Sequence, residues 1–397
     1  MRLPLMLFYG QSWMALNSNN GRILDRNPFP DHAWMMGGQN APVLQERGAI
    51  TAPFEDFRPA SDLNGNVQSV VTPFLYRYVS EALEDGRPAT CVGYSGAVSG
   101  ARLAQLLPED DPDFEAGSHG FDNLMQAVDA HMSFAQNRGM EGHVPYLIFC
   151  QGAGDREMPK DAYTPRLERL IGTLQARIAV CTGQETPPHI VMIQPPGKGN
   201  GGAWPCLQGQ VELCARRTDM TLALAGWAIE QHDRTHFSGP GAVTAGELCA
   251  ITARGIEQGT PVSAPYMRRA RKTGAGEIEV EIEASGDMLI DTDQRSPRHR
   301  VRGVTVPNFG FELAGVPVRQ ISLAPRKLRF TFDADPPERI AFAYHAGSDF
   351  LVTRNDKANQ SANRGNLRLG QTWNSIFSER KLYHWLASGY LDIIDEG

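Results

Sequence analysis

The strongest constraint on the fold is a change of sequence pattern near Pro265. Before it, short apolar runs alternate with stretches in which apolar residues recur at helical spacing. This alternation is typical of a parallel sheet covered by helices, because each parallel strand needs a long crossover to reach the next one. We therefore predict an α/β domain over residues 1–265 with a five-stranded parallel sheet. The expected strands are residues 3–9, 90–94, 145–151, 189–194 and 221–227.

After Pro265 the pattern becomes that of an antiparallel β domain. A basic, glycine-containing stretch at residues 268–276 reads as a link, and apolar and polar residues then alternate with a period of two. Such alternation indicates strands that bury one face only. We predict an accessory β-sandwich over residues 275–397, completed by the aromatic C-terminal segment around Trp373, Tyr383 and Trp385. Its expected strands are residues 277–283, 301–306, 316–323, 327–332 and 339–344.

Charge and composition exclude several classes of partner. The net charge is −7 and the chain lacks the basic stripe that would neutralise phosphates, so nucleic acid is not an expected partner. No apolar run approaches the length of a membrane span, and the apolar start at residues 1–10 reads as a strand rather than a leader. The six cysteines form no Cys-x-x-Cys pair, which favours buried free thiols over disulfides and argues against structural zinc.

Ser12 ends the first expected strand, in the run Phe8-Tyr-Gly-Gln-Ser-Trp13. A strand that ends in Gly-x-Ser places the hydroxyl at the carboxyl edge of a parallel sheet, where open α/β folds bind their ligands. The first N–H groups of a following helix can stabilise negative charge beside it. A serine at such a turn is also a common helix N-cap, and this alternative stays open.

Asp233 and His236 lie in one short segment, Asp233-Arg-Thr-His236-Phe-Ser-Gly-Pro-Gly241, after the last expected strand. A serine hydroxyl is a weak nucleophile until a base removes its proton, and imidazole does so best when a carboxylate fixes its tautomer. Asp-x-x-His supplies both groups from one loop; the alternative is a surface loop with an unrelated histidine. His32 and His232 show no metal-ligand spacing and are interpreted as structural or surface residues.

The two motifs together resemble those of the SGNH (GDSL-like) hydrolases. Gly-Gln-Ser at the first strand and Asp-x-x-His-Phe-Ser-x-x-Gly before the last helix are most similar to the branch with sialate O-acetylesterases and acetylxylan esterases. The resemblance covers about residues 3–255. It implies a flavodoxin-like catalytic domain in which Ser12 is the nucleophile, His236 the general base and Asp233 its orienting partner.

The same resemblance implies an oxyanion hole. Its donors in the family are the nucleophile's own N–H, a glycine N–H after the second strand and an Asn or Gln side chain after the third, each contributing about 3–4 kcal/mol. We assign Ser12, Gly96 and Gln151 to these roles, with Gly93 as the alternative to Gly96. A plain turn for either glycine and an ordinary hydrogen bond for Gln151 remain open. The branch typically reads Gln-Gly-Glu here, whereas this sequence has Ala153 in place of the Glu. This departure weakens the inference about the substrate more than the inference about the type of reaction.

Three further features bear on the substrate cleft. The long polar segment at residues 17–60 follows the nucleophile and is expected to lie over the site. The glycine-rich run at residues 197–202 is either a wall of the pocket or a flexible connection. Trp13, Trp34 and Trp204 could stack on a sugar ring, although a buried tryptophan is the commoner outcome.

These observations favour a carboxylic ester hydrolase that removes O-acetyl groups from a carbohydrate such as sialic acid, xylan or a surface polysaccharide. An acyl-enzyme intermediate is expected, and no metal or organic cofactor. Two alternatives stay open. The chain could be a carbohydrate-binding, adhesion or viral appendage protein that keeps the fold, or an esterase of lipid or thioester acyl groups.

Overall fold

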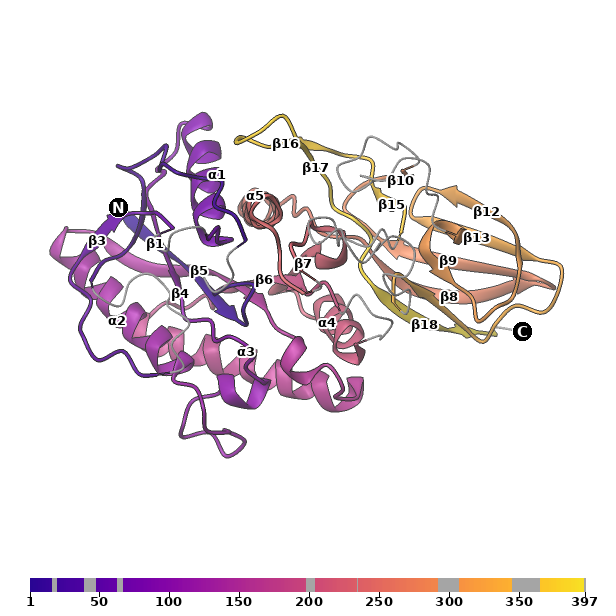
Figure 1. The fold of residues 1–397 in the computed structure, drawn as a ribbon, viewed down its shortest axis with the longest axis horizontal. Helices are drawn as coiled ribbons and strands as arrows, with labels where there is room; N and C mark the ends of the chain where they lie inside the picture. Colours follow the sequence, from indigo (N-terminus) through magenta and orange to yellow (C-terminus); the bar gives the residue numbers. More distant parts are fainter. Residues whose placement is uncertain are drawn as a thin grey trace.

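The computed structural model describes residues 1–15, 20–38, 48–62, 67–197, 204–233, 235–291, 307–344 and 365–395. Two β sheets of seven strands each dominate this part of the chain, and each is built around its own hydrophobic core. Figure 1 shows the helices gathered around the first sheet and the second sheet beside it. All six cysteines are free thiols, as the sequence predicted.

The first sheet has the strand order β3-β2-β4-β1-β5-β6-β7. Every pair is parallel except β2 and β3. The five predicted strands are present, but the predicted count of five is wrong because residues 17–60 add two short strands at one edge. The strands are β1 (Arg2–Gly10), β2 (Ala33–Met36), β3 (Phe57–Pro59), β4 (Cys91–Ser95), β5 (Glu141–Cys150), β6 (His189–Gln194) and β7 (Met220–Ala225).

In the described part of the chain, five α-helices cover the two faces of this sheet. Helices α1 and α5 pack together on one face, and α2, α3 and α4 lie on the other (Figure 1). None of the described helices combines the length and the apolar character that a membrane crossing requires. The helices are α1 (Val71–Glu84), α2 (Gly120–Asn137), α3 (Lys160–Thr182), α4 (Pro205–Arg216) and α5 (Gly239–Glu257).

The second sheet has the order β11-β14-β18-β8-β9-β13-β12. The predicted link at residues 268–276 is wrong, because this stretch forms most of β8 and pairs with β9. The C-terminal strand β18 runs parallel to β8, so the sheet is mixed rather than purely antiparallel as predicted. The expected strand at residues 301–306 lies outside the described residues. The strands are β8 (Tyr266–Gly274), β9 (Glu277–Glu283), β11 (Phe311–Glu312), β12 (Val318–Ala324), β13 (Lys327–Phe332), β14 (Arg339–Phe342) and β18 (Gly389–Ile394).

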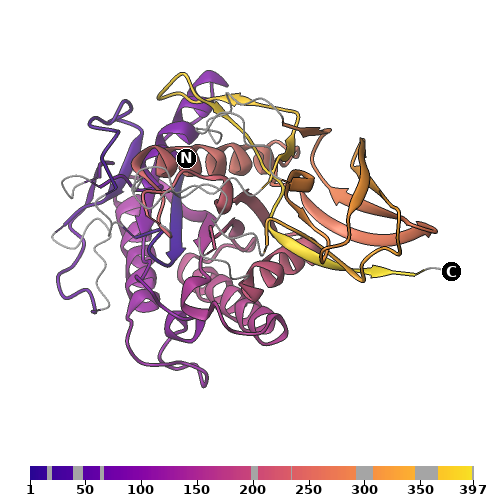
Figure 2. The ribbon, with the colours of Figure 1, turned by 45° about the vertical axis from the view of Figure 1, so that its right-hand side comes forward.

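A C-terminal hairpin returns from the second sheet to the first. It consists of β16 (Trp373–Asn374) and β17 (Lys381–Leu382), and Figures 1 and 2 show it lying over α1. Arg77 of α1 donates a hydrogen bond of 2.7 Å to the Asn374 carbonyl oxygen. The aromatic C-terminal segment is therefore divided: Trp385 lies in the second core, whereas Trp373 packs against the first.

Candidate active site

Ser12 lies in a tight turn at the carboxyl end of β1. Gly10 has φ +118°, and a Cβ at this position would lie 2.1 Å from the Cys150 carbonyl oxygen, so only glycine fits. The Gln11 N–H donates to that same oxygen at 2.8 Å, and the chain then turns through bonds from Met14 and Ala15 to the Gln11 carbonyl. Close contact with β5 thus forces the chain to turn immediately before the serine.

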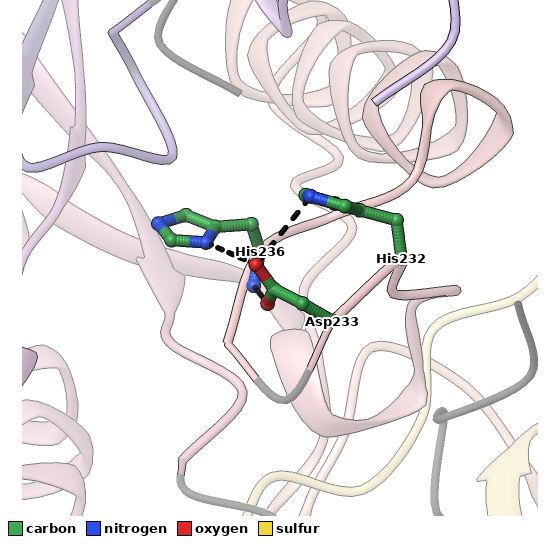
Figure 3. A group of neighbouring side chains, drawn as sticks. All are labelled: His232, Asp233 and His236. Atoms are coloured by element: carbon green, nitrogen blue, oxygen red, sulfur yellow. Dashed lines mark hydrogen bonds and ion pairs between the residues drawn. The ribbon is translucent and has the colours of Figure 1, made fainter. Parts of the chain in front are cut away.

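The loop after β7 carries His232, Asp233 and His236. It is closed by a bridge between Gln231 and Phe237, and α5 begins directly after it with Ser238 as N-cap. Figure 3 shows the Asp233 carboxylate lying between the two imidazole rings. The Asp233 Oδ1 atom also accepts hydrogen bonds from the backbone N–H groups of Thr235 and His236, both at 2.6 Å. These bonds fix the carboxylate within its own loop.

The structure brings Ser12, His236 and Asp233 into one hydrogen-bonded line. Nε2 of His236 lies 3.0 Å from Ser12 Oγ, and Nδ1 of the same ring lies 2.7 Å from Asp233 Oδ2. A carboxylate can only accept, so Nδ1 carries the proton and Nε2 presents its lone pair to the serine. Burial raises the pKa of Asp233, but the bonds from His236 and Thr235 outweigh it and hold this pKa well below its usual value.

Trp13 joins the two halves of the site. Its indole N–H donates a hydrogen bond of 2.7 Å to the Thr235 carbonyl oxygen, and its ring centroid lies 6.3 Å from that of His236. Trp13 is only 4% exposed, so it is a buried tie between the serine turn and the histidine loop and presents no face for a sugar. Ser12 itself retains 9% of its surface.

The Gly96 N–H and the Gln151 amide, which were predicted as oxyanion donors, both make hydrogen bonds within the protein. The Gly96 N–H donates to the Phe8 carbonyl oxygen at 3.0 Å, which extends the ladder between β1 and β4. Gln151 is fully buried, and its Nε2 group donates to Asp155 Oδ2 at 2.5 Å and to the Ala101 carbonyl oxygen at 3.3 Å. Both amide hydrogens therefore have acceptors within the protein, and the oxyanion role of Gln151 remains a prediction.

The alternative glycine and the serine N–H differ from these two. Gly93 lies within β4, where a Cβ would come within 2.7 Å of a Leu75 methyl group, so close packing of α1 explains this glycine. Within the described part of the chain, the Ser12 N–H donates no hydrogen bond. Of the three predicted donors, it alone makes no hydrogen bond to any of the residues that the structure describes.

Sequence reasoning missed the part played by Gln11, the middle residue of Gly-Gln-Ser. Its side chain is fully buried, and Nε2 donates to the Ala101 carbonyl oxygen at 2.7 Å. Its Oε1 atom accepts the N–H groups of Gly152 and Ala153, both at 2.9 Å. The Gln11 amide thus connects three loops at the carboxyl edge of the sheet. The Gly-Gln-Ser motif was the sequence feature that could have indicated this role.

The remaining predicted features fall in different places. Trp204 is 4% exposed, and Trp34 stacks on Phe57 and donates to the Pro30 carbonyl oxygen at 3.1 Å. Most of the glycine-rich run, residues 198–202, lies outside the described residues. From the long polar segment, Asn20 reaches the histidine loop, where its carbonyl oxygen accepts the N–H of Gly239 at 2.7 Å. At least this part of the segment therefore borders the site.

The fold has known counterparts, although no protein-family model and no curated protein matches the sequence. One solved structure similar to this chain is XAC1771, a carbohydrate acetylesterase from Xanthomonas citri. It has 15% sequence identity and a TM-score of 0.63, and the alignment covers 98% of this chain and 80% of that one. At this identity the likeness shows a shared fold.

Two further structures align with about two thirds of this chain. They are NanS, with 10% identity over 65% of this chain and 97% of that one, and Est24, a carbohydrate acetylesterase from Sinorhizobium meliloti, with 13% identity over 64% and 99%. Their TM-scores are 0.43 and 0.33. Of these three structures, the Xanthomonas one is therefore used as the comparison for the fold.

Proposed function

We propose that this protein is a serine esterase that removes O-acetyl groups from a carbohydrate. The observation that carries the proposal is the line from Ser12 through His236 to Asp233, with contacts of 3.0 and 2.7 Å. Ser12 and His236 lie 224 residues apart in the sequence, so their contact does not follow from local chain geometry. A hydroxyl, an imidazole and a carboxylate in this order form a catalytic triad, in which the oriented imidazole activates the serine. We refer to Ser12, His236 and Asp233 as the relay.

The geometry supports a two-step reaction. Ser12 Oγ attacks the ester carbonyl carbon while its proton passes to Nε2 of His236, and the tetrahedral oxyanion forms. The carbon–oxygen bond to the sugar then breaks, and the leaving oxygen takes the proton from Nε2. Water attacks the acetyl-enzyme with His236 again as base, which releases acetate and restores Ser12.

Asp233 keeps the base in the correct tautomer throughout these steps. Its lowered pKa keeps it a carboxylate while the imidazolium forms beside it, and this charge stabilises the imidazolium. We propose the Ser12 N–H as one donor to the oxyanion. Any further donor must come from groups other than the Gly96 N–H and the Gln151 amide unless the hydrogen bonds of these two change when substrate binds.

The choice of an acetylated saccharide follows from two supports. The Xanthomonas structure that shares this fold is a carbohydrate acetylesterase. The long polar segment that includes Asn20 borders the histidine loop, as expected of a segment that shapes a cleft for a polar substrate.

The reaction is tested by hydrolysis of p-nitrophenyl acetate. We expect Ser12→Ala to lower kcat/KM by about 10⁴-fold or more, because removal of the nucleophile leaves only binding and oxyanion contacts. Ser80→Ala is the matched control, since Ser80 lies on α1 and its hydroxyl bonds Glu84 of the same helix. Equal rates for wild type and Ser12→Ala would exclude the serine mechanism.

The substrate class is tested separately. Acetyl and octanoyl esters of p-nitrophenol should be hydrolysed with a clear preference for acetyl, and O-acetylated xylan or sialic acid should release acetate. Rates that rise with acyl length would favour the lipid alternative instead. Saccharide binding without any acetate release would favour the adhesion alternative.

A further inference from the structure

His232 has no part in the proposed reaction, yet it faces the same carboxylate as His236. Its Nδ1 atom lies 3.1 Å from the Phe237 carbonyl oxygen, which can only accept, so Nδ1 carries the proton. In the neutral ring Nε2 therefore presents a lone pair, and it lies 3.4 Å from Asp233 Oδ2. Two acceptors that face each other call for a cation between them, either a proton or a metal ion.

His236 supplies a third potential ligand. Its Nδ1 atom approaches the same Asp233 oxygen from the other side, and one ligand atom from each of the three residues lies within 4.8 Å of the others. A tetrahedral zinc ion with bonds of about 2.0–2.1 Å places its ligands about 3.3 Å apart. The contact between His232 and Asp233 already has this spacing, and that between His236 and Asp233 needs to open by about 0.6 Å. The ligand atoms of the two histidines lie within 4.8 Å of each other and need to move toward the same spacing.

We propose that His232, Asp233 and His236 form a binding site for a divalent transition-metal ion of the zinc class. Two imidazole nitrogens and one carboxylate oxygen are a ligand set that zinc prefers. A zinc-bound histidine generally donates its other ring N–H to a carbonyl or carboxylate, which is what His232 does toward Phe237. The three side chains are 28%, 44% and 28% exposed, so an ion can reach them from solvent.

The surrounding loop holds the ligands in place. Beyond the bridge between Gln231 and Phe237, the Ser238 N–H donates to the Glu230 carbonyl oxygen at 2.9 Å. Arg380 from the C-terminal hairpin pairs with the Glu230 carboxylate at 3.3 Å. This pair offsets the charge of Glu230, so the electrostatic attraction for a cation comes chiefly from Asp233.

Metal binding would inactivate the proposed triad, and this consequence rests on the proposed function. Coordination takes the lone pair of His236 Nδ1, so the proton of the neutral ring moves from Nδ1 to Nε2 through solvent. Nε2 then donates to Ser12 and can no longer accept its proton. The ion also takes the Asp233 oxygen that orients the ring. A metal ion and an active relay are therefore mutually exclusive, with no change in oxidation state.

The site itself is tested by zinc titration of the full chain at neutral pH, using isothermal calorimetry. We expect one saturable site in the wild type whose affinity falls by about 10- to 100-fold or more in both His232→Asn and His232→Gln. His119→Asn is the control, since Glu109, His119 and Asp122 form the second group of potential ligands in the described residues. Absence of saturable binding, or equal affinity in the His232 variants, would overturn the proposal.

Hydrolysis of p-nitrophenyl acetate then tests the consequence. Zinc should inhibit the wild type and His119→Asn, a chelator should restore the rate, and the His232 variants should resist inhibition when each is compared with its own zinc-free rate. Zinc binding that depends on His232 without any ester hydrolysis would preserve the metal site and refute the proposed function. Ester hydrolysis without zinc binding would do the reverse.

Discussion

The two sides of Ser12 differ in how they are built. On one side, His236 and Asp233 come from a single short loop and contact each other and the serine at 2.7 and 3.0 Å. On the other side, Gln151 comes from the end of β5 and lies in a buried network with Asp155 and Tyr163. The first side presents its reactive atom toward the serine, whereas the second uses its polar atoms to hold the sheet edge together.

This difference shows what a motif can and cannot specify. Asp-x-x-His fixes a carboxylate and an imidazole within one turn, so their contact follows from local geometry. The direction of the Gln151 amide depends on Ala101, Asp155 and Tyr163, which lie on three other segments. A side chain that could meet a substrate is instead satisfied by the protein, as buried amides generally are.

The largest test of the relay side is Asp233→Asn. An amide in this position no longer holds the Nδ1 proton, so the imidazole can present the wrong nitrogen to Ser12, and kcat should fall by about 10⁴-fold. Asp161→Asn, at an exposed position in the first turn of α3, is the control. If Asp233→Asn keeps more than about a tenth of the wild-type kcat, the His236–Asp233 side does not have the catalytic role that distinguishes it from the Gln151 side.

The side of Ser12 that carries the Gln151 amide is tested by Gln151→Leu. The change leaves the buried Asp155 carboxylate and the Tyr163 hydroxyl short of a partner, so the free energy of unfolding in urea should fall by about 2–4 kcal/mol. Below the unfolding transition, kcat should change by less than about tenfold.

Gln210→Leu provides the matched control for this test. Gln210 is equally buried and donates to the Gln151 carbonyl oxygen at 2.6 Å and to Tyr163 at 3.0 Å. If Gln151 were an oxyanion donor, its variant alone would lose about 10²- to 10³-fold in kcat. That result would restore the role predicted from the sequence.

Acid should weaken the fold independently of the relay. Burial lowers the pKa of His131 and of His384 to about 4, and in each case a hydrogen bond to a carbonyl opposes this only in part. The unfolded chain takes up these protons below about pH 6.5, so stability is complete above that pH and is lost as pH falls toward about 4. For each of these two histidines, the free energy of unfolding should fall by about 2 kcal/mol between pH 7 and pH 5.

Urea unfolding at these two pH values measures the loss. His131→Gln removes one titrating ring and should shrink the loss by about 2 kcal/mol relative to the wild type. A free energy of unfolding that is independent of pH would contradict the burial of neutral histidines. The measurement also sharpens the comparison, because a loss of activity in acid can then be separated from a loss of fold.

The smallest effect is expected from Trp13→Phe. This change keeps the ring but removes the N–H that bonds the Thr235 carbonyl oxygen, so the free energy of unfolding should fall by about 1 kcal/mol and kcat by a few fold. Trp34→Phe is the control at a distance from the relay. An unchanged kcat would show that the serine turn and the histidine loop keep their alignment without this tie.

Much of the first sheet could be predicted from the sequence, because its central strands are long apolar runs. The predicted bounds of β6, β9 and β13 agree with those of the structure. Strands β2 and β3 could not be predicted, since four and three residues within a polar segment carry no measurable period. They become strands because β2 adds to the free edge of β4, which is a long-range contact.

The misinterpreted strand β8 shows the same limit from another direction. Its cations suggested an exposed link, but Arg268 and Arg271 pair across the sheet with Glu283 and Glu279 of β9. Met267 and Ala270 meanwhile face the second core. Charged residues suit a strand when the neighbouring strand supplies opposite charges, and that register is not visible in one segment alone.

His232 was likewise interpreted from its spacing alone. It directly precedes Asp233, and adjacent residues give no indication that their side chains converge. The Phe237 carbonyl turns the ring back toward the carboxylate, which only the closed loop reveals.

The central claim is that Ser12 is an activated nucleophile, and a serine-reactive phosphonate tests it most directly. After the wild type is incubated with the probe, peptide mass spectrometry should find one adduct on Ser12, and its rate of formation should drop sharply in Asp233→Asn. Ester hydrolysis that persists while Ser12 remains unlabelled, or an adduct on another serine, would contradict the account.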